Sequence, residues 1–465
     1  MTEFREESDL LGSRSVPRDA YWGIHTLRAC ENFPVSGAAT PLELIYAYAR
    51  VKKAACLANR DLGFLTPDSA DAVCAACEDI VSGLLDDQFP IDALQGGAGT
   101  STNMNVNEVI ANRALYHMGK ASGSYECIDP IDHVNLHQST NDTYPTALKV
   151  AAIEGVRSLS AGLARLQGAF QQKEKAFSRI LTIGRTEMQP AVPMTLGSIF
   201  SGFAQAISRD RWRTAKCEER LRVVNIGGTA VGTGLTAPRR YIFLVIEKLR
   251  EVTGMGLTRG ESGVDQTANA DSIVEVSGIL DACAVNLRKI SNDLRLLHLH
   301  EEIRLAPVQA GSSIMPGKVN PVIAEAGITA GLKVSTNHSL ISQAVASGTL
   351  QISEFLPLCA HALLESIRIL TSAADMLAHH VESIEACEKM CGQHADNSPM
   401  LVTAFIPLIG YHTAQALLTE YQKGDHAISF RHFLQQKLGQ EIVRQTLTPE
   451  NIMALGYRGK RSFKN

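Results

Sequence analysis

The stretch GSSIMPGKVNP, residues 311–321, concentrates groups that can do acid–base chemistry on an anion. Two hydroxyls, Ser312 and Ser313, are followed by the cation Lys318 and the amide of Asn320. Glycine and proline punctuate the stretch, so we expect a flexible loop whose backbone N–H groups can face an anion. A solvated turn before a helix explains the same residues, because the proline that ends the stretch can open a helix. The loop by itself leaves both interpretations open.

Nucleotide binding by the glycine-rich segments is disfavoured. The P-loop pattern has four residues between its two glycines and a hydroxyl after the lysine. Here five residues separate Gly311 from Gly317, and Val319 follows the lysine. The segment GTGLTA at 232–237 matches a minimal dinucleotide fingerprint, but no alternation of strands and helices surrounds it. We therefore expect no cofactor.

Three further segments are rich in hydroxyl and amide side chains. They are GGAGTSTNMNVNE at 96–108, HQSTNDTYP at 137–145 and GRTEMQPAVP at 184–193. Each can cap a helix, since Ser, Thr and Asn favour helix starts. Together with the loop they exceed what capping needs, and they suit a small anion held by many hydrogen bonds, such as a dicarboxylate. The candidate side chains are Thr100, Ser101, Ser139, Thr140, Asn141, Thr186 and Glu187.

Long amphipathic helices must position these segments. Apolar residues recur at alternating steps of four and three over 276–297, the pattern of a helix packed in a bundle. Similar stripes run over 156–170 and 363–377. The sequence therefore predicts an all-α, mainly helical protein with an elongated central bundle. Because such a bundle can continue into a neighbouring subunit, the pattern also favours a homo-oligomer.

The character of the sequence changes twice along the chain. Residues 1–140 mix short helices with turn-rich segments and are predicted to form an N-terminal, mostly helical domain. Residues 141–395 contain the stripes and are predicted to form the central bundle. Residues 396–465 have weaker periodicity and are predicted to form a small C-terminal helical domain.

Composition narrows the class of partner. The chain has 465 residues and a net charge of -4, and no basic stretch is interleaved with aromatic residues, so nucleic-acid binding is not expected. No apolar run is long enough to span a membrane, and the N-terminus lacks the apolar core of a secretory signal. We expect a cytoplasmic protein whose partner is a small molecule.

Cysteine and histidine usage gives little support to a metal site. The ten cysteines are scattered through predicted helices, as expected in a reducing compartment. The pairs Cys74/Cys77 and Cys387/Cys391 lack the second ligand pair that zinc needs, and small apolar packing explains them better. The HLHEE stretch at 298–302 looks like a metal site, but histidines two positions apart diverge on a helix.

Three of these segments match a known family. GSSIMPGKVNP resembles the signature G-S-S-x-M-x-x-K-x-N-P of the aspartase/fumarase superfamily. GGAGTSTNMNVNE and HQSTNDTYP look like its other two active-site segments, and they follow in the expected order. Within the superfamily the stretch DLLGSRSVPRDAYWGIHTLRACENF, residues 9–33, is more similar to aspartate ammonia-lyases than to fumarases. The resemblance covers nearly the whole chain.

The resemblance implies a fold, an assembly and a reaction. Three mostly helical domains would assemble into a homotetramer with a twenty-helix core, and each active site would draw on three subunits. The implied reaction is β-elimination from a substituted succinate: a base removes the Cβ proton, the enzyme holds the aci-carboxylate dianion, and the Cα substituent leaves. The expected example is loss of ammonia from L-aspartate to give fumarate.

The family pattern also assigns roles by position. Ser312 matches the catalytic base, and Ser313 would help to stabilise its alkoxide. Lys318 and Asn320 would grip the reacting carboxylate. The hydroxyl and amide side chains of the other three segments would bind the carboxylates and the amino group of the substrate.

Two departures from the family pattern bear on the substrate. Glu187 stands where Gln or His is usual; it could hold an ammonium or another basic leaving group, or turn to Arg185 or a neighbouring subunit. The usual G-P-R-x-G-L-x-E segment before the loop is missing, and HLHEE at 298–302 stands there. The alternatives are a lyase for a different substituted succinate or a fumarate hydratase, and the non-enzyme alternative is a structural paralogue.

Overall fold

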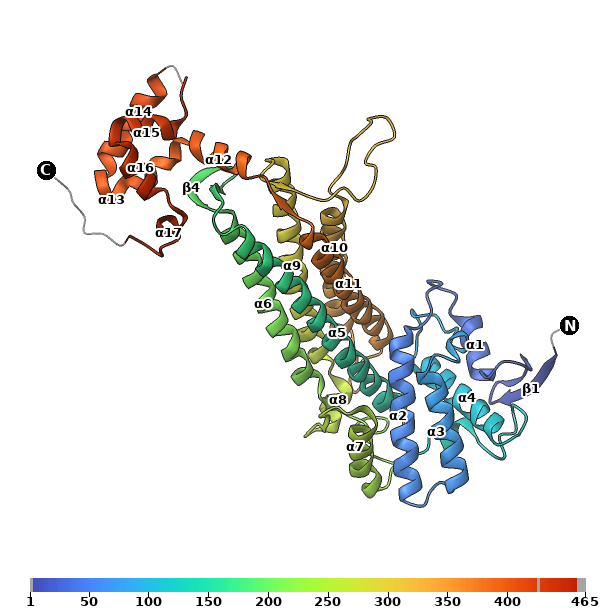
Figure 1. The fold of residues 1–465 in the computed structure, drawn as a ribbon. Coiled ribbons are helices and arrows are strands. Elements are labelled where there is room, and N and C mark those ends of the chain that lie inside the picture. The colour runs from blue at the N-terminus through green and yellow to red at the C-terminus, as the bar shows by residue number, and fades with distance from the viewer. Residues whose placement is uncertain (1–2, 425–426, 458–465) are drawn as a thin grey trace. The chain divides into compact units, whose positions relative to one another are not determined.

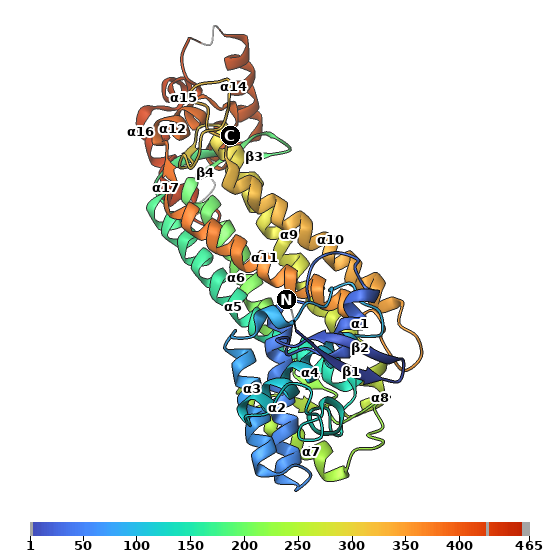
Figure 2. The ribbon, with the colours of Figure 1, turned by 90° about the vertical axis from the view of Figure 1, so that its right-hand side faces the viewer.

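The computed structural model describes residues 3–424 and 427–457, which form mainly helices (Figure 1, Figure 2). The prediction of a mainly helical protein is confirmed. The contacts divide the chain into two compact units. Unit 1 comprises residues 1–160, 212–284 and 332–371, and unit 2 comprises residues 161–211, 285–331 and 372–465. The three consecutive domains expected from the sequence stay a prediction.

Five long helices contribute residues to both units. They are α5 (Thr140–Ala176), α6 (Leu196–Leu221), α9 (Asp271–Leu299), α10 (Val322–Ala346) and α11 (Leu356–Glu382). The three predicted apolar stripes lie on α5, α9 and α11, and all of their side chains are buried. In unit 2, for example, Phe170 of α5 packs against Phe203 of α6 with ring centroids 5.5 Å apart.

Unit 1 builds a layer of shorter helices around α2. They are α1 (Ile24–Asn32), α2 (Leu42–Asp61), α3 (Pro67–Val81), α4 (Thr100–His117), α7 (Arg239–Thr253) and α8 (Gly263–Ala268), with the helical turns η1 (Asp86–Gln88) and η2 (Pro130–Val134). Helix α2 packs against α3 and α7, and α3 packs against α4 (Figure 2). Small buried residues on α2, such as Ala47, Ala54 and Ala58, let these neighbours approach closely.

The last helices of unit 2 enclose an apolar cluster of their own. They follow α12 (Glu388–Asn397) and are η3 (Pro399–Phe405), α13 (Ile406–Ile409), α14 (Tyr411–Lys423), α15 (Phe430–Leu438), α16 (Gln440–Thr446) and α17 (Pro449–Ile452). Phe405, Phe430 and Leu434 are fully buried at the centre of this cluster.

The strands of the described residues are short and pair two by two. The antiparallel pairs are β1 (Phe4–Asp9) with β2 (Gly12–Pro17), β3 (Leu181–Thr186) with β4 (Gln189–Thr195), and β7 (Ile303–Arg304) with β8 (Glu385–Ala386). The parallel pair is β5 (Val223–Val224) with β6 (Thr258–Arg259). Of these, the hairpin β3–β4 and the strand β7 matter for the site, because candidate residues lie on or directly after them.

The structure also bears on the expectations about membrane-spanning helices and about the cysteines. Among the helices of residues 3–424 and 427–457, none has both the length and the apolarity needed to cross a bilayer. All ten cysteines are free thiols. Cys77 and Cys391 are buried, as the packing interpretation predicts, whereas Cys74 and Cys387 are partly exposed.

Candidate active site

The loop 305–321 connects β7 to α10 in unit 2, and its own backbone closes it (Figure 1). The N–H of Gly311 donates to the carbonyl of Lys318 at 2.7 Å, and the side-chain amide of Asn320 donates to the carbonyl of Gly311 at 2.9 Å. A Cβ at Gly311 would lie 2.8 Å from the carbonyl oxygen of Lys318 and the backbone nitrogen of Asn320, so glycine is required at this crossing. The crossing places Ser312, Lys318 and Asn320 in one short region.

The hydroxyl of Ser312 is arranged to hold negative charge. Its Oγ accepts hydrogen bonds from the backbone N–H groups of Ile314 at 3.2 Å and Met315 at 3.0 Å. These two hydrogen bonds form a short turn over residues 312–315, which stabilises the loop locally. The same two donors would stabilise an alkoxide at Oγ, which is what a serine needs to act as a base.

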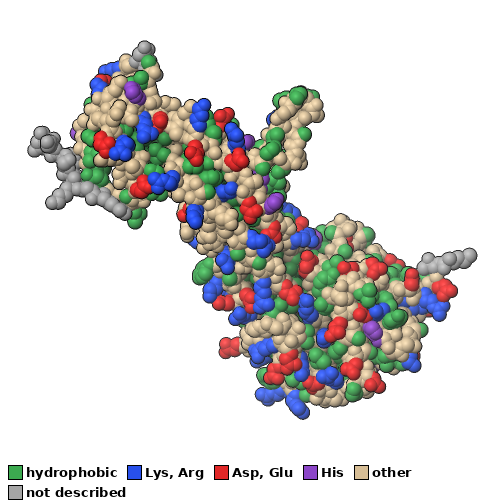
Figure 3. Space-filling model, viewed as in Figure 1, with side chains coloured by type: hydrophobic (Ala, Val, Ile, Leu, Met, Phe, Trp, Pro, Cys, Tyr) green, Lys and Arg blue, Asp and Glu red, His purple; other side chains and the backbone are tan. Residues whose placement is uncertain are grey.

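The outer part of the loop is exposed and largely apolar. Ile314 is 84% exposed, and Met315 and Val319 are also exposed. On the face drawn in Figure 3, the loop presents mainly hydrophobic and uncharged side chains. Ser313 and Lys318 are exposed too, and Lys318 forms no ion pair with any residue that the structure describes. Exposed apolar side chains on a loop are typical of a segment that buries them against a ligand or another surface.

In unit 1 the segment before α4 turns through three residues of positive φ. Residues 97–99 have φ angles of 82°, 57° and 91°, and Thr100 and Ser101 then form the first turn of α4. Gly99 lies against the ring of Tyr144, where a Cβ would approach to 2.2 Å. The N–H groups of Thr100 and Thr102 are already bonded, to the carbonyl of Gly97 and to Gln95 Oε1. The positive end of the helix dipole still lies beside the hydroxyls of Thr100 and Ser101, a favourable setting for a carboxylate.

Ser139, Thr140 and Asn141 lie at the start of α5, and helix capping uses part of them. Ser139 Oγ accepts the N–H of Asn141 at 3.2 Å, and the amide of Asn141 donates to the carbonyl of Ala230 at 2.7 Å. Thr140 is buried, and its Oγ1 accepts a hydrogen bond from the amide of Asn103 on α4 at 3.1 Å. This bond joins the starts of α4 and α5, so the structure brings the two polar segments together.

Thr186 and Glu187 lie at the tip of the hairpin β3–β4 in unit 2. Glu187 and Met188 have φ angles of 49° and 59°, the backbone of a tight hairpin turn that Asn and Gly adopt at lower cost. Glu187 is exposed and has no ion-pair partner within the described ranges. The alternative in which Glu187 turns to Arg185 is wrong here, because the Arg185 guanidinium is engaged by Glu302.

Glu302 anchors this hairpin from the HLHEE stretch. Arg185 donates to its two carboxylate oxygens at 2.9 and 2.8 Å, Thr182 donates to it at 2.8 Å, and His394 Nδ1 lies 2.9 Å from it. Burial raises the pKa of Glu302, but the hydrogen bonds from Arg185, His394 and Thr182 outweigh burial and lower it below the ordinary value. HLHEE therefore holds the hairpin. No group of three or more His, Cys, Asp or Glu side chains in the described part of the chain is placed to hold a metal ion.

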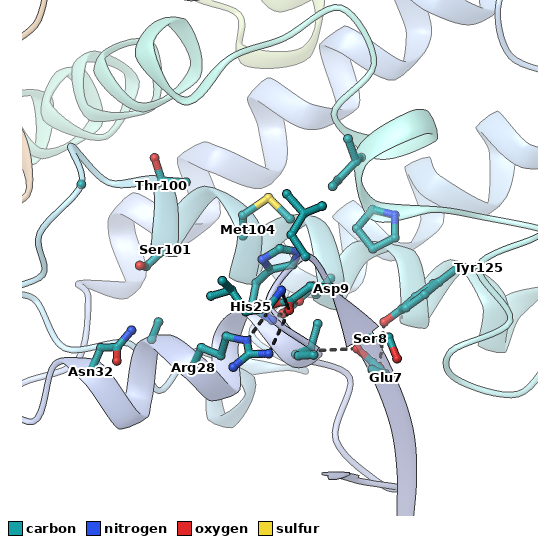
Figure 4. A pocket seen from close by; sticks show the side chains of 18 of the residues that line it. Glu7, Ser8, Asp9, His25, Arg28, Asn32, Thr100, Ser101, Met104 and Tyr125 are labelled. Carbon is teal, nitrogen blue, oxygen red and sulfur yellow. Dashed lines mark hydrogen bonds and ion pairs between the residues drawn. The ribbon is translucent and has the colours of Figure 1, made fainter. Parts of the chain in front are cut away.

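A cavity of about 1030 Å³ lies beside Thr100 and Ser101 in unit 1 (Figure 4). Its lining includes two side chains absent from the predicted set, His25 and Arg28 of α1. Arg28 donates two hydrogen bonds of 2.8 Å to Asp9, so much of its charge is already balanced. Both residues belong to the HTLRA stretch, but nothing in that stretch predicts that α1 lies beside the start of α4.

The predicted site residues are divided between the two units. Unit 1 contains Thr100, Ser101, Ser139, Thr140 and Asn141, and unit 2 contains Thr186, Glu187, Ser312, Ser313, Lys318 and Asn320. In unit 1 the two segments are joined by hydrogen bonds of Asn103 with Thr140 and Thr143. In unit 2 the loop residues lie together at one backbone crossing. Their roles in catalysis stay predictions.

This chain is similar in sequence and in structure to known lyases. A family model described as Lyase matches residues 12–335. The aspartate ammonia-lyase of Helicobacter pylori is 41% identical over 459 residues, which cover 97% of this chain and 98% of that protein. A crystal structure of a fumarate lyase:delta crystallin from Brucella melitensis has a TM-score of 0.92 and 42% identity, covering 96% of this chain and 99% of that one. A class II fumarase from Schistosoma mansoni has a TM-score of 0.90 and 30% identity, covering 98% and 100%.

Proposed function

The chain belongs to the Lyase family and is a carbon–nitrogen lyase, and from this premise we propose that it eliminates ammonia from L-aspartate to give fumarate. Relatives named aspartate ammonia-lyase, similar over nearly their full length, support this substrate over that of the fumarase neighbour. The observation that carries the mechanism is the Ser312 hydroxyl with two backbone N–H donors.

Ser312 is the base in this mechanism. Its alkoxide takes the Cβ proton, and the C–H electron pair moves into the adjacent carboxylate to form the aci-carboxylate dianion. That pair then forms the Cα–Cβ double bond, the C–N bond breaks, and ammonia leaves with the bonding electrons. The donors from Ile314 and Met315 lower the cost of the alkoxide, and Lys318 with Asn320 holds the carboxylate on which charge accumulates.

The segments at the starts of α4 and α5 bind the unreacted parts of the substrate. Their hydroxyls and the positive ends of the helix dipoles suit a carboxylate, and Thr186 adds a hydroxyl from the hairpin tip. We place the enzyme in the cytoplasm as a homotetramer in which different subunits supply these segments to one site. Closure of the loop 305–321 excludes water from that site.

The substrate is tested by incubating the purified protein with L-aspartate and following the ultraviolet absorbance of fumarate. Absorbance should rise with L-aspartate and stay flat with L-malate. A rise with malate alone would identify a fumarate hydratase. No rise with either substrate would refute both assignments.

A lyase for a different substituted succinate is the second candidate, and Glu187 favours it. Its exposed carboxylate at a strained turn has no ion-pair partner among the described residues, so it suits a basic leaving group larger than ammonia. Running the reaction in reverse with fumarate and a panel of amines separates the candidates. If Glu187 binds the amine, Glu187→Gln will lose activity with the preferred amine, whereas its activity with ammonia will change little.

A further inference from the structure

Lys52 is a charged side chain buried in the middle of α2. It is 0% exposed, and the elimination mechanism above does not use it. Its Nζ donates to Asn135 Oδ1 at 2.8 Å and lies 5.9 Å from the ring centroid of Tyr48. A buried ammonium costs free energy unless it is well solvated by the protein, so its presence in unit 1 calls for a role.

The acceptor of the Lys52 ammonium, Asn135 Oδ1, is the centre of a buried amide network. Asn135 Oδ1 also accepts hydrogen bonds from Asn103 at 3.2 Å and from Asn107 at 3.3 Å. Asn103 donates in turn to Thr140 Oγ1, and the amide of Asn135 donates to the carbonyl of Gln138 at 3.2 Å. Lys52 thus orients the amide of Asn135, whose oxygen in turn orients Asn103, and the two amides bond to Gln138 and Thr140 around the start of α5.

Within the described residues, no carboxylate in direct contact neutralises the Lys52 ammonium. Asp142 is the carboxylate that acts on it electrostatically, but no ion pair joins them within the described ranges. Asp142 accepts backbone N–H groups instead, from Ser139 at 3.0 Å, Gly227 at 3.1 Å and Thr229 at 2.9 Å. Burial lowers the pKa of Lys52 to about 7 and raises that of Asp142 to about 7. A dianion bound above this network would favour the charged form of Lys52.

We propose that Lys52 is a positioning residue of the dicarboxylate site, which fixes Asn135 and Asn103 and thereby the hydroxyl of Thr140. The inference rests on the proposed function, because it takes the starts of α4 and α5 as the anion-binding segments. It adds a residue that touches neither the substrate nor the reacting atoms.

The test compares Lys52→Met and Asn135→Ala with Lys53→Met in the full-length protein. Lys53, the next residue, is matched in type but points outward and pairs with Glu78. For each protein we would measure kcat and KM for L-aspartate, and the dissociation constant of succinate by calorimetry. Lys52→Met and Asn135→Ala should each raise KM and the succinate dissociation constant about tenfold or more. kcat should change much less, and Lys53→Met should leave all three values near wild type.

The pair of variants also forms a thermodynamic cycle. If Lys52 acts through Asn135, the double variant will bind succinate no more weakly than the worse single variant. Folded Lys52→Met with an unchanged succinate dissociation constant overturns the inference, as does Asn135→Ala with an unchanged constant should Lys52→Met fail to fold. A wild type that binds succinate but is inert to aspartate refutes only the proposed substrate.

Discussion

The helix starts in unit 1 and the loop in unit 2 hold their polar groups in opposite ways. Thr140 is buried and bonded to Asn103, which belongs to a network of amides around Lys52. Ser312 and Lys318 lie on a loop held by its own backbone crossing, with Ile314 and Met315 exposed around them. The first region is a buried, hydrogen-bonded frame, and the second is an exposed loop of unit 2.

This difference matches what a β-elimination needs. Substrate carboxylates must be held in a preorganised position, so binding groups belong on rigid elements. The base must meet the Cβ proton in a site from which water is excluded, and a loop can bring it there after the substrate has bound. In the proposed mechanism the buried helix starts of unit 1 bind the unreacted parts of the substrate, whereas the exposed loop of unit 2 supplies the proton acceptor and the groups that hold the reacting carboxylate.

Removing the base should produce the largest effect. We expect Ser312→Ala to lower kcat roughly a thousandfold, because no other group replaces the proton acceptor. The thermal unfolding midpoint should stay near that of the wild type, since the loop contributes little to the packed core. Steady-state kinetics and thermal unfolding on the same preparation measure both. A large fall in the unfolding midpoint would show that the loop is packed as well as the helix starts of unit 1, contrary to the difference described above.

Much of this architecture could be predicted from the sequence, because it depends on local patterns. The stripes over 156–170, 276–297 and 363–377 follow helical spacing, and burial of one face forces that spacing. The loop and the polar segments are recognisable because Gly311 and the hydroxyl clusters are local features. It is the family resemblance that assigns the loop and the polar segments to one site.

The rest depends on contacts between distant residues. The partner of Arg185 is Glu302, more than a hundred positions away, whereas Glu187 was the nearer carboxylate in sequence. Arg28 of α1 lines the cavity beside Thr100, and Lys52 is linked to Asn103 of α4 through Asn135. Hydrophobic periodicity does not predict such polar pairs, because it indicates which face of a helix is buried and not which buried polar groups contact each other.

Two glycines offer a smaller and more direct test of rigidity. Gly99 and Gly317 have similar φ angles of 91° and 81°. A Cβ at Gly99 would collide with Tyr144 at 2.2 Å, whereas a Cβ at Gly317 meets nothing within 4 Å. We expect Gly99→Ala to lower the free energy of unfolding by about 2–4 kcal/mol and Gly317→Ala by about 1 kcal/mol, measured by urea titration. Equal losses would mean that the loop is as tightly packed as the helix start.

The smallest expected effect concerns the stem of the loop, where Glu302 directly precedes β7. Its pKa is lower in the folded protein than in the unfolded chain, so its contribution to stability is complete above the unfolded value and is lost as pH falls through the folded value. We expect the urea midpoint of the wild type to fall as pH drops below about 4.5, and Glu302→Gln to remove part of that dependence, on the order of 1 kcal/mol. Glu441 is the control: Arg444 also lowers its pKa, but this pair is exposed and screened by solvent, so Glu441→Gln should change the pH dependence much less than Glu302→Gln. A different outcome is that Glu302→Gln leaves the pH dependence of unfolding unchanged but shifts the pH dependence of kcat. Residue 302 would then move with the loop during catalysis, and the moving segment would begin before β7.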